Sequence, residues 1–554
     1  MGFLVSPGVE VNEIDLTNVI PAVSTSIGGF VGEFRWGPVG EAITVSSEKE
    51  LASYYGAPTD DFAKSFLTAA SFLKYGTTLK ISRAIKPSSV AATVASGSIT
   101  TYKSVTQSFP VNAKYLGALG NSLQVYIAAA GAIINSAVSD SLNSPTTGIS
   151  TFSSAYQTTD SQGSEVKDEI HIVVVDEDGE ITGKKGTILE VWEGLSLFTD
   201  AKKEDGSNLY FKDVINDNSS WIQIGTVTGG QTRATAYTNS GTASSGSATL
   251  KSLASGSDGS GSYGYDTAAE VFRDTETMDV NFLFTVDNGS TGLNPGETKI
   301  IDIVNDRKDC IAFISAPDIS SKTSDADRLS DVTDKFEFVT STSYVVLDST
   351  PLYVYNKYSD KYIWIPACGH MAGLCANTDD VAEPWFSPAG YNRGQLLGVT
   401  KLAFNPKQTP RDTLYKARIN PIVAFPGQGI LLFGDKTAQA KPSAFDRINV
   451  RRLFITLEKA ISTAAKYQLF ELNDEFTRAM FRNMVEPFLR EVKGRRGVTD
   501  FLVICDETNN TGEVIDTNRF VADIYIKPAR SINFITLNFI ATRTGVEFSE
   551  IVGK

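Results

Sequence analysis

Asn281-Phe-Leu-Phe-Thr285 is an apolar run of the kind that forms a buried strand, and Cys310-Ile-Ala-Phe-Ile-Ser315 is a second such run. Residues 297–308, between them, have the composition of a helix. Because parallel strands need a long connection, two strands separated by one helix predict a parallel crossover unit. A mixed α/β domain is therefore expected around this stretch.

The beginning of the chain has a similar texture. Short apolar runs alternate with glycine turns up to residue 87, as in Ile27-Gly-Gly-Phe-Val-Gly-Glu-Phe-Arg-Trp-Gly-Pro38. Two helices are predicted at about 47–55 and 60–75. We expect this segment to belong to the same domain as the crossover unit.

Residues 88–275 differ from both flanks because Ser, Thr, Gly and Ala dominate them. Tracts of this composition cannot bury much apolar surface. Strand-like runs stand between them, such as Ile170-His-Ile-Val-Val-Val175 and Gly186-Thr-Ile-Leu-Glu-Val-Trp192. The pattern predicts a β-rich insertion with long surface loops, which interrupts the domain around it.

The C-terminal third has a helical period. One stripe predicts a helix that ends near Phe470 and contains Val450, Leu453, Phe454, Leu457, Ile461, Ala464 and Ala465. A second stripe predicts a helix that Pro487 kinks or ends, and contains Phe476, Met480, Met484 and Phe488. After the basic turn Lys493-Gly-Arg-Arg-Gly497, strands are expected at 501–505, 520–526 and 532–540.

Both ends of the chain are extended runs with alternating polarity, at residues 7–20 and 545–554. A terminal strand must find a sheet edge, either in its own chain or in a neighbouring one. Because most terminal strands close their own domain, the residue pattern alone favours pairing within the chain.

Composition limits the function. A chain of 554 residues exceeds one hydrophobic core, so several domains are expected. The net charge of -14 disfavours nucleic acid as a partner. Four cysteines are too few for a disulfide framework and are expected to be small buried groups in a reducing cytosol. We expect neither a signal peptide nor a membrane-inserted segment.

Three features could indicate chemistry, and each has a simpler structural reading. Cys368-Gly-His-Met-Ala-Gly-Leu-Cys375 lacks a fourth metal ligand and is expected to be a tight turn with buried cysteines. In Gly429-Ile-Leu-Leu-Phe-Gly-Asp-Lys-Thr437, Asp435 separates the glycine from the lysine, and its carboxylate would repel a phosphate. We therefore expect a strand and a turn instead of a phosphate-binding loop. The two histidines, His171 and His370, are far apart in sequence. We therefore predict no metal, no cofactor and no enzymatic activity.

Several blocks resemble the contractile tail sheath proteins of T-even-type myovirus bacteriophages. These blocks are Pro7-Gly-Val-Glu-Val11, Gly29-Phe-Val-Gly-Glu-Phe-Arg-Trp-Gly-Pro38, Phe386-Ser-Pro-Ala-Gly390, Ile419-Asn-Pro-Ile-Val-Ala-Phe-Pro-Gly427 and the tail from Val492 to Lys554. The most specific block is Phe501-Leu-Val-Ile-Cys-Asp-Glu507 with residues 509–516. The resemblance covers roughly the first 87 and the last 250 residues.

The resemblance implies an α+β multidomain fold with a mixed α/β core built from both chain ends, an inserted β-rich outer region and extended terminal arms. The expected domains are an N-terminal arm at 1–22, a middle domain at 23–87 plus 276–442, the insertion at 88–275, a C-terminal core at 443–543 and a C-terminal arm at 544–554.

The resemblance also implies partners. Copies of the chain would form hexameric rings that stack helically around an inner tail tube, together with baseplate and tail terminator proteins. The sheath would be assembled in the host cytoplasm, become part of the virion tail and contract to drive the tube through the host envelope. Its arms would add strands to neighbouring sheets. The residues expected to pair are Val9, Val11, Ile14, Leu16, Val546, Phe548, Ile551 and Val552.

The basic turn stands out in an acidic chain. Lys493, Arg495 and Arg496 form either a solvated loop or a contact with the tube or with a neighbour's Asp506, Glu507 and Asp516. Two other function classes stay open at this point. The chain could be an outward-facing decoration protein or adhesin whose insertion binds host glycans, or it could be a hydrolase.

Overall fold

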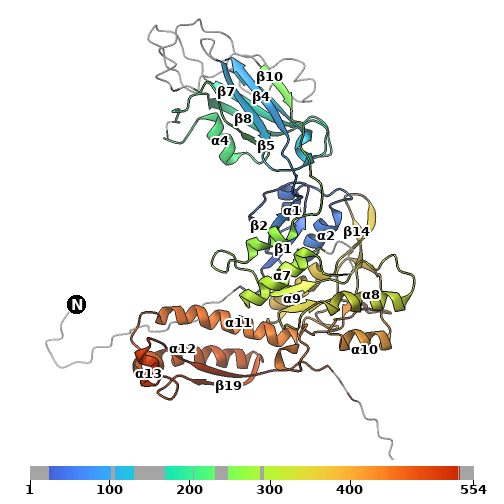
Figure 1. The fold of residues 1–554 in the computed structure, drawn as a ribbon, viewed down its shortest axis with the longest axis vertical. Helices are drawn as coiled ribbons and strands as arrows, with labels where there is room; N and C mark the ends of the chain where they lie inside the picture. Colours follow the sequence, from blue (N-terminus) through green and yellow to red (C-terminus); the bar gives the residue numbers. More distant parts are fainter. Residues whose placement is uncertain are drawn as a thin grey trace, which may run out of the picture. The chain divides into compact units, whose positions relative to one another are not determined.

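The computed structural model describes residues 24–100, 106–129, 169–203, 205–230, 232, 248–286, 292–533 and 536 (Figure 1). The described residues form two compact units. Unit 1 contains residues 382–387 and the chain from Arg447 onward, and unit 2 contains residues 24–381 and 388–446. The domain limits expected from the sequence stay predictions, and both terminal arms lie outside the described residues.

A six-stranded sheet forms the centre of unit 2, in the order β13-β12-β11-β1-β3-β2. All neighbours pair in parallel except β2, which is antiparallel to β3. The strands are β1 (Gly28–Glu33), β2 (Ala42–Val45), β3 (Leu79–Ala84), β11 (Phe282–Thr285), β12 (Ile311–Ile314) and β13 (Val345–Leu347). The parallel crossover predicted from the sequence is confirmed, because β11 and β12 pair in parallel and the helix α7 (Pro295–Arg307) connects them.

Helices cover this sheet, and smaller sheets flank it. The helices are α1 (Glu48–Tyr55), α2 (Ala63–Phe72), α6 (Tyr265–Ala269), α7, α8 (Asp325–Glu337), α9 (Cys368–Val381) and α10 (Gln408–Lys416). The other strands are β14 (Leu352–Asn356), β15 (Lys361–Ile365), β16 (Val399–Leu402), β17 (Ile422–Phe425) and β18 (Gly429–Leu432). The predicted helices near 47–55 and 60–75 and the predicted strand at Gly429 are therefore confirmed.

A buried ion pair joins α7 to α8. Asn294 and Glu297 form a capping box at the start of α7, where the Asn294 side chain accepts from the Glu297 amide and the Glu297 carboxylate accepts from the Asn294 amide. The other oxygen of Glu297 accepts a hydrogen bond of 3.0 Å from the Lys335 ammonium, and both side chains are fully buried. The carboxylate thus caps one helix and neutralises a lysine of the next.

Asp348 organises a second buried network at the end of β13. Its carboxylate accepts hydrogen bonds from the Ser315 hydroxyl (2.7 Å) and the Ala316 amide (3.0 Å). The Ser315 hydroxyl in turn accepts from the Cys368 amide at the start of α9. Burial raises the pKa of Asp348 to about 6, so removing this carboxylate from water costs more than its hydrogen bonds return.

The segment that begins at Cys368 forms the helix α9, so the tight turn expected there is wrong. Two glycines of this helix allow close packing against its neighbours. A Cβ on Gly369 would lie 2.3 Å from the Thr68 carbonyl oxygen of α2, and one on Gly373 would lie 2.5 Å from the Tyr75 ring. The prediction that all four cysteines are buried is confirmed.

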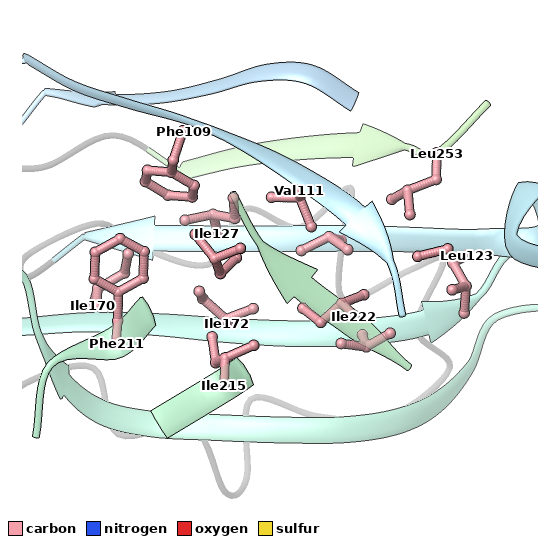
Figure 2. Packing of buried hydrophobic residues seen from close by; sticks show 14 of the residues in the cluster. Phe109, Val111, Leu123, Ile127, Ile170, Ile172, Phe211, Ile215, Ile222 and Leu253 are labelled. Carbon is pink, nitrogen blue, oxygen red and sulfur yellow. The ribbon is translucent and has the colours of Figure 1, made fainter. Parts of the chain in front are cut away.

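The insertion contains two antiparallel sheets, β10-β6-β7-β8 and β4-β5-β9. Its elements are β4 (Thr93–Thr100), β5 (Thr106–Ala113), β6 (Leu123–Ala129), β7 (Glu169–Asp176), β8 (Thr187–Ser196), α4 (Phe211–Asn218), β9 (Ile222–Ile224) and β10 (Ala248–Ser252). Figure 2 shows side chains from both sheets and from α4 meeting in one apolar core, including Phe109, Ile127, Ile172, Phe211 and Ile222. The β-strands expected at 170–175 and 186–192 are confirmed.

The described part of unit 1 consists of two long helices, one short helix and a hairpin, drawn in orange and red in Figure 1. Its elements are α11 (Ile448–Ala465), α12 (Glu475–Gly494), β19 (Val498–Ile504), α13 (Gly512–Asp516) and β20 (Asp523–Pro528). Residues of α11, α12 and β19 share one core, which contains Leu453, Leu457, Phe481, Val485, Leu489 and Val503. The strands near 501–505 and 520–526 are confirmed, whereas most of the strand expected at 532–540 lies outside the described residues.

Pro487 lies inside α12 and does not end it, because the helix continues to Gly494. Two further details of the helix prediction in unit 1 are wrong. Phe476 belonged to the predicted core stripe but is 70% exposed, because the buried face of α12 follows Phe481, Val485 and Leu489. The first helix ends at Ala465, followed by a 3-10 turn at Lys466–Gln468 rather than by further helix to Phe470.

Replacing Lys335 by Met should destabilise unit 2, because it leaves the Glu297 carboxylate buried without its cation. Breaking a buried pair from one side costs about 3–5 kcal/mol. Urea unfolding followed by circular dichroism measures the loss. Lys322→Met is the matched control, because Lys322 forms a 2.7 Å ion pair with Asp331 at the surface and should leave the midpoint unchanged. Equal midpoints for both variants would contradict a structural role for the buried pair.

Asp348 should make stability depend on pH. Burial raises the pKa of Asp348 in the folded chain from its ordinary value of 3.8 to about 6. The stabilising effect of protonation is therefore complete below pH 3.8 and is lost as the pH rises through 6. The shift corresponds to roughly 3 kcal/mol. Asp348→Asn should therefore gain stability relative to the unmodified chain between pH 4.5 and 7.5, as measured by urea midpoints. Parallel pH profiles for the two chains would refute this assignment.

Candidate assembly interface

The hairpin β19–β20 is a two-stranded sheet with one packed face. Phe501 and Val503 of β19, with Ile524 and Ile526 of β20, turn toward the helices of unit 1. The opposite face carries the cross-strand pair Leu502 and Tyr525, which are 55% and 58% exposed. Among the described residues, each strand has a sheet neighbour on one side only. The hairpin therefore offers two edges and a partly apolar outer face.

Asn510 fastens the connection between the two strands. Its amide donates to the carbonyl oxygens of Asp506 (3.2 Å) and Val521 (2.8 Å), and its oxygen accepts from the Val521 amide (2.9 Å). The Asn473 amide, just before α12, donates to the same oxygen and to the Arg519 carbonyl. Asn510 lies in the block that resembles sheath proteins most specifically. Together with Asn473, it holds the hairpin to the start of α12.

Two of the three residues of the predicted basic contact are neutralised within unit 1. The Lys493 ammonium lies 3.1 Å from Asp500, and the Arg495 guanidinium contacts Glu383 (2.6 Å) and Glu491 (2.7 Å). The hydrogen bond from Lys493 lowers the pKa of Asp500, and the bond to Glu383 raises the pKa of Arg495. These are exposed pairs and add little stability.

Arg496 is the exception in the basic turn. It is exposed, has no ion-pair partner in the described part of the chain and adopts a left-handed φ of 67°. The turn packs closely on Val492 and Trp385: a Cβ on Gly497 would lie 2.7 Å from Val492 and 3.0 Å from the Trp385 ring. The Trp385 indole also donates to the Arg495 carbonyl. The turn thus exposes Arg496 to solvent without an ion-pair partner among the described residues.

An exposed cluster at the other end of α12 did not figure in the sequence prediction. We name it the apolar corner; it consists of Tyr467, Leu469, Phe470, Leu472 and Phe476. The signal was present as the run Tyr467-Gln-Leu-Phe-Glu-Leu472, which continues past the end of α11 without a helical period. The helical stripe assigned Phe476 to the core and so hid it.

The expected pairing residues of the arms lie outside the described residues. Their pairing therefore stays a prediction, and so does the sheet to which they would add a strand; the residues are Val9, Val11, Ile14, Leu16, Val546, Phe548, Ile551 and Val552.

The residues considered for catalysis or metal binding serve the core. The Tyr75 hydroxyl accepts from the Leu397 amide and is hydrogen-bonded with Nδ1 of His370 at 3.0 Å. Burial, and then the charge of Lys74, lowers the pKa of His370 to about 3, so its ring stays neutral. The described residues contain no group of three His, Cys, Asp or Glu side chains that could hold a metal ion. None of their helices is long and apolar enough to cross a membrane.

The fold has relatives among solved structures. The chain superposes on the sheath tail protein from Listeria innocua with a TM-score of 0.54 at 11% identity, covering 93% of this chain and 97% of that one. It superposes on the contracted sheath complex of an extracellular contractile injection system with a TM-score of 0.52 at 13% identity, covering 98% and 99%. At these identities the similarity establishes the fold.

Sequence comparison extends the similarity to nearly the whole chain. The tail sheath protein of Vibrio phage KVP40 is 33% identical over 99% of this chain and 100% of its own length. That of Enterobacteria phage T4 is 31% identical over 99% of each chain. Residues 282–438 match the central domain of phage tail sheath proteins, and residues 440–542 match their C-terminal domain. The resemblance seen in the sequence is confirmed: this chain belongs to the family of contractile phage tail sheath proteins.

Proposed function

We propose that copies of this chain polymerise as hexameric rings stacked helically around an inner tail tube, and that this sheath contracts to drive the tube through the host envelope. Family membership supports the sheath role. The names of two structural relatives, a contractile injection system sheath complex and a helical sheath in the contracted state, describe such assemblies. Baseplate and tail terminator proteins would bind the ends of the sheath, which would be assembled in the host cytoplasm.

The hairpin β19–β20 is the observation that carries this proposal. A two-stranded sheet is marginally stable by itself, and each of its edges offers backbone groups to a further strand. The predicted arms are suited to this role because apolar residues alternate along them, as in Val9 and Val11 or Val546 and Phe548. Backbone hydrogen bonds would give the added strand its strength, and the alternating side chains would fix its register.

The lengths of the arms allow them to reach a neighbour. Residues 544–554 span at most roughly 36 Å when extended, and residues 1–22 span at most roughly 73 Å. A helix of 20 residues such as α12 is about 30 Å long. Both arms can therefore extend past unit 1 of their own copy. Such links would keep neighbours connected while their folded cores rotate during contraction.

Contraction would need no nucleotide. Subunits in a metastable arrangement would repack into a more stable one, and each would contribute only a few kcal/mol because many identical copies move together. We propose that the chain is a structural protein without enzymatic activity, cofactor or metal, and that nucleic acid is not among its partners.

Removing residues 544–554 tests the arm. The truncated chain should fold with an unchanged thermal unfolding midpoint but should not form long tubes in negative-stain electron micrographs. Phe548→Pro should have the same effect, because proline lacks the N–H that a strand donates. Phe548→Tyr is the matched control, since it keeps that donor and its β propensity.

The outcomes separate the alternatives. Tubes of normal length from the truncated chain would refute strand exchange through this arm. If the unmodified chain formed only discrete oligomers, the decoration or adhesin role would be favoured over the sheath.

A further inference from the structure

The apolar corner gathers five exposed large apolar side chains in one short segment of unit 1. Phe470 is 104% exposed, Leu472 77% and Phe476 70%, and Tyr467 and Leu469 are exposed to a similar degree. All five side chains lie within ten consecutive residues. Soluble monomers rarely leave contiguous apolar patches of this kind uncovered, and such patches mark contacts with other molecules.

The conformation of the corner is unfavourable in an isolated copy. Phe470 adopts a left-handed φ of 71°, which bulky residues rarely do. Neighbouring Gln468 has both amide atoms buried without a hydrogen-bond partner in the described structure. Backbone hydrogen bonds from Leu469 to Lys466 and from Glu471 to Gln468 nevertheless define the turn. Hydrogen bonds thus define the backbone of this turn, and Phe470 points away from the core of its own unit.

Acidic residues lie within and beside the corner. Glu471 and Glu475 are exposed and have no ion-pair partner among the described residues, and Asp474 caps α12 through the Thr477 amide. The acidic segment 506–516 lies at the same end of unit 1, because Asn473 is hydrogen-bonded to Asn510. This end therefore combines apolar side chains with negative charge.

The opposite end of α12 has the complementary chemistry. Arg496 presents its unpaired charge there, beside the half-buried ring of Trp385. The amide of Ala529 donates to the Gly497 carbonyl, which brings the chain after β20 next to the basic turn. Three residues farther on, Ile532 is 82% exposed. This end offers a cation together with apolar surface.

We propose that the apolar corner of one copy docks on the basic turn of the next copy, with Phe470 against the apolar surface at Ile532 and Trp385, and with Glu471 and Glu475 facing Arg496. The inference rests on the proposed polymerisation and names the surfaces that meet. A second copy is the occupant because this chain carries both halves of the contact. Since the two surfaces differ and lie at opposite ends of one helix, the contact is head-to-tail and generates rings or helices.

Phe470→Asp is the first test. Because the side chain is fully exposed, the variant should unfold at the same temperature as the unmodified chain. It should form less than about one tenth of the sedimentable tubes, since burial of a charge in the contact opposes docking. Phe338→Asp is the matched control: Phe338 is 69% exposed in unit 2, and its replacement should leave polymerisation unchanged.

A charge exchange is the second test. Glu471→Lys with Glu475→Lys should weaken polymerisation, and so should Arg496→Asp, since aspartate tolerates the left-handed backbone at this position. All three changes together should restore tubes toward the normal level. Glu276→Lys with Glu337→Lys serves as the control for the loss of acidic charge elsewhere in the chain, because both residues are exposed and belong to unit 2.

These measurements separate the inference from the proposed function. If the unmodified chain formed no tubes, the proposed polymerisation would fail. If it formed tubes and the Phe470→Asp chain formed them equally well, the docking surface would be wrong. Normal polymerisation of Phe470→Asp alone, combined with failure on purified inner tubes, would identify the tube as the occupant and overturn the contact between copies. Absence of rescue in the triple variant would also overturn the pairing.

Discussion

A two-stranded sheet cannot satisfy its own edges, and this constraint shapes unit 1. The hairpin β19–β20 is held on one face by the core that it shares with α11 and α12, and its connection is fastened by Asn510. The shared core thus stabilises one face of the hairpin, and in the described part of the chain no further strand pairs with either edge. Any further strand must come from elsewhere in the chain or from another copy. The extended, alternating composition of both termini fits that requirement.

Charged residues of unit 1 stabilise the ends of α12 and form ion pairs with its neighbours. Glu475 lies in the first turn of α12 and Lys493 in the last, as the helix dipole favours. Ion pairs neutralise Lys493 and Arg495 within the unit, so the basic turn carries less unpaired positive charge than its sequence implies. Arg496 has a left-handed φ of 67° and no ion-pair partner among the described residues. The contact expected at the basic turn stays a prediction, in which Arg496 is the residue whose charge is not compensated within the described part of unit 1.

Sequence reasoning succeeded where a single pattern had a single solution. The apolar runs of β11 and β12 could only be buried strands, and the helix between them required a parallel crossover. It failed where two solutions were compatible. The stripes of Phe476 and Phe481 both have helical spacing on α12, and only tertiary packing decides which one faces α11. The sequence predicts a tight turn at Cys368, whereas the missing Cβ of Gly369 and Gly373 allows the helix α9 to approach α2 and Tyr75.

Magnitudes suggest why both arms and an apolar corner would be needed. Burial of a side chain such as Phe470 contributes about 1.5–3 kcal/mol, and an exposed ion pair adds at most about 1 kcal/mol. The loss of freedom on association costs more than this, so such a contact between free copies would be weak. An arm already paired with a neighbour makes the docking step effectively intramolecular, which raises the local concentration of the corner to the millimolar range. Copies linked in this way can break weak contacts and form others without separating, as a sheath that shortens must.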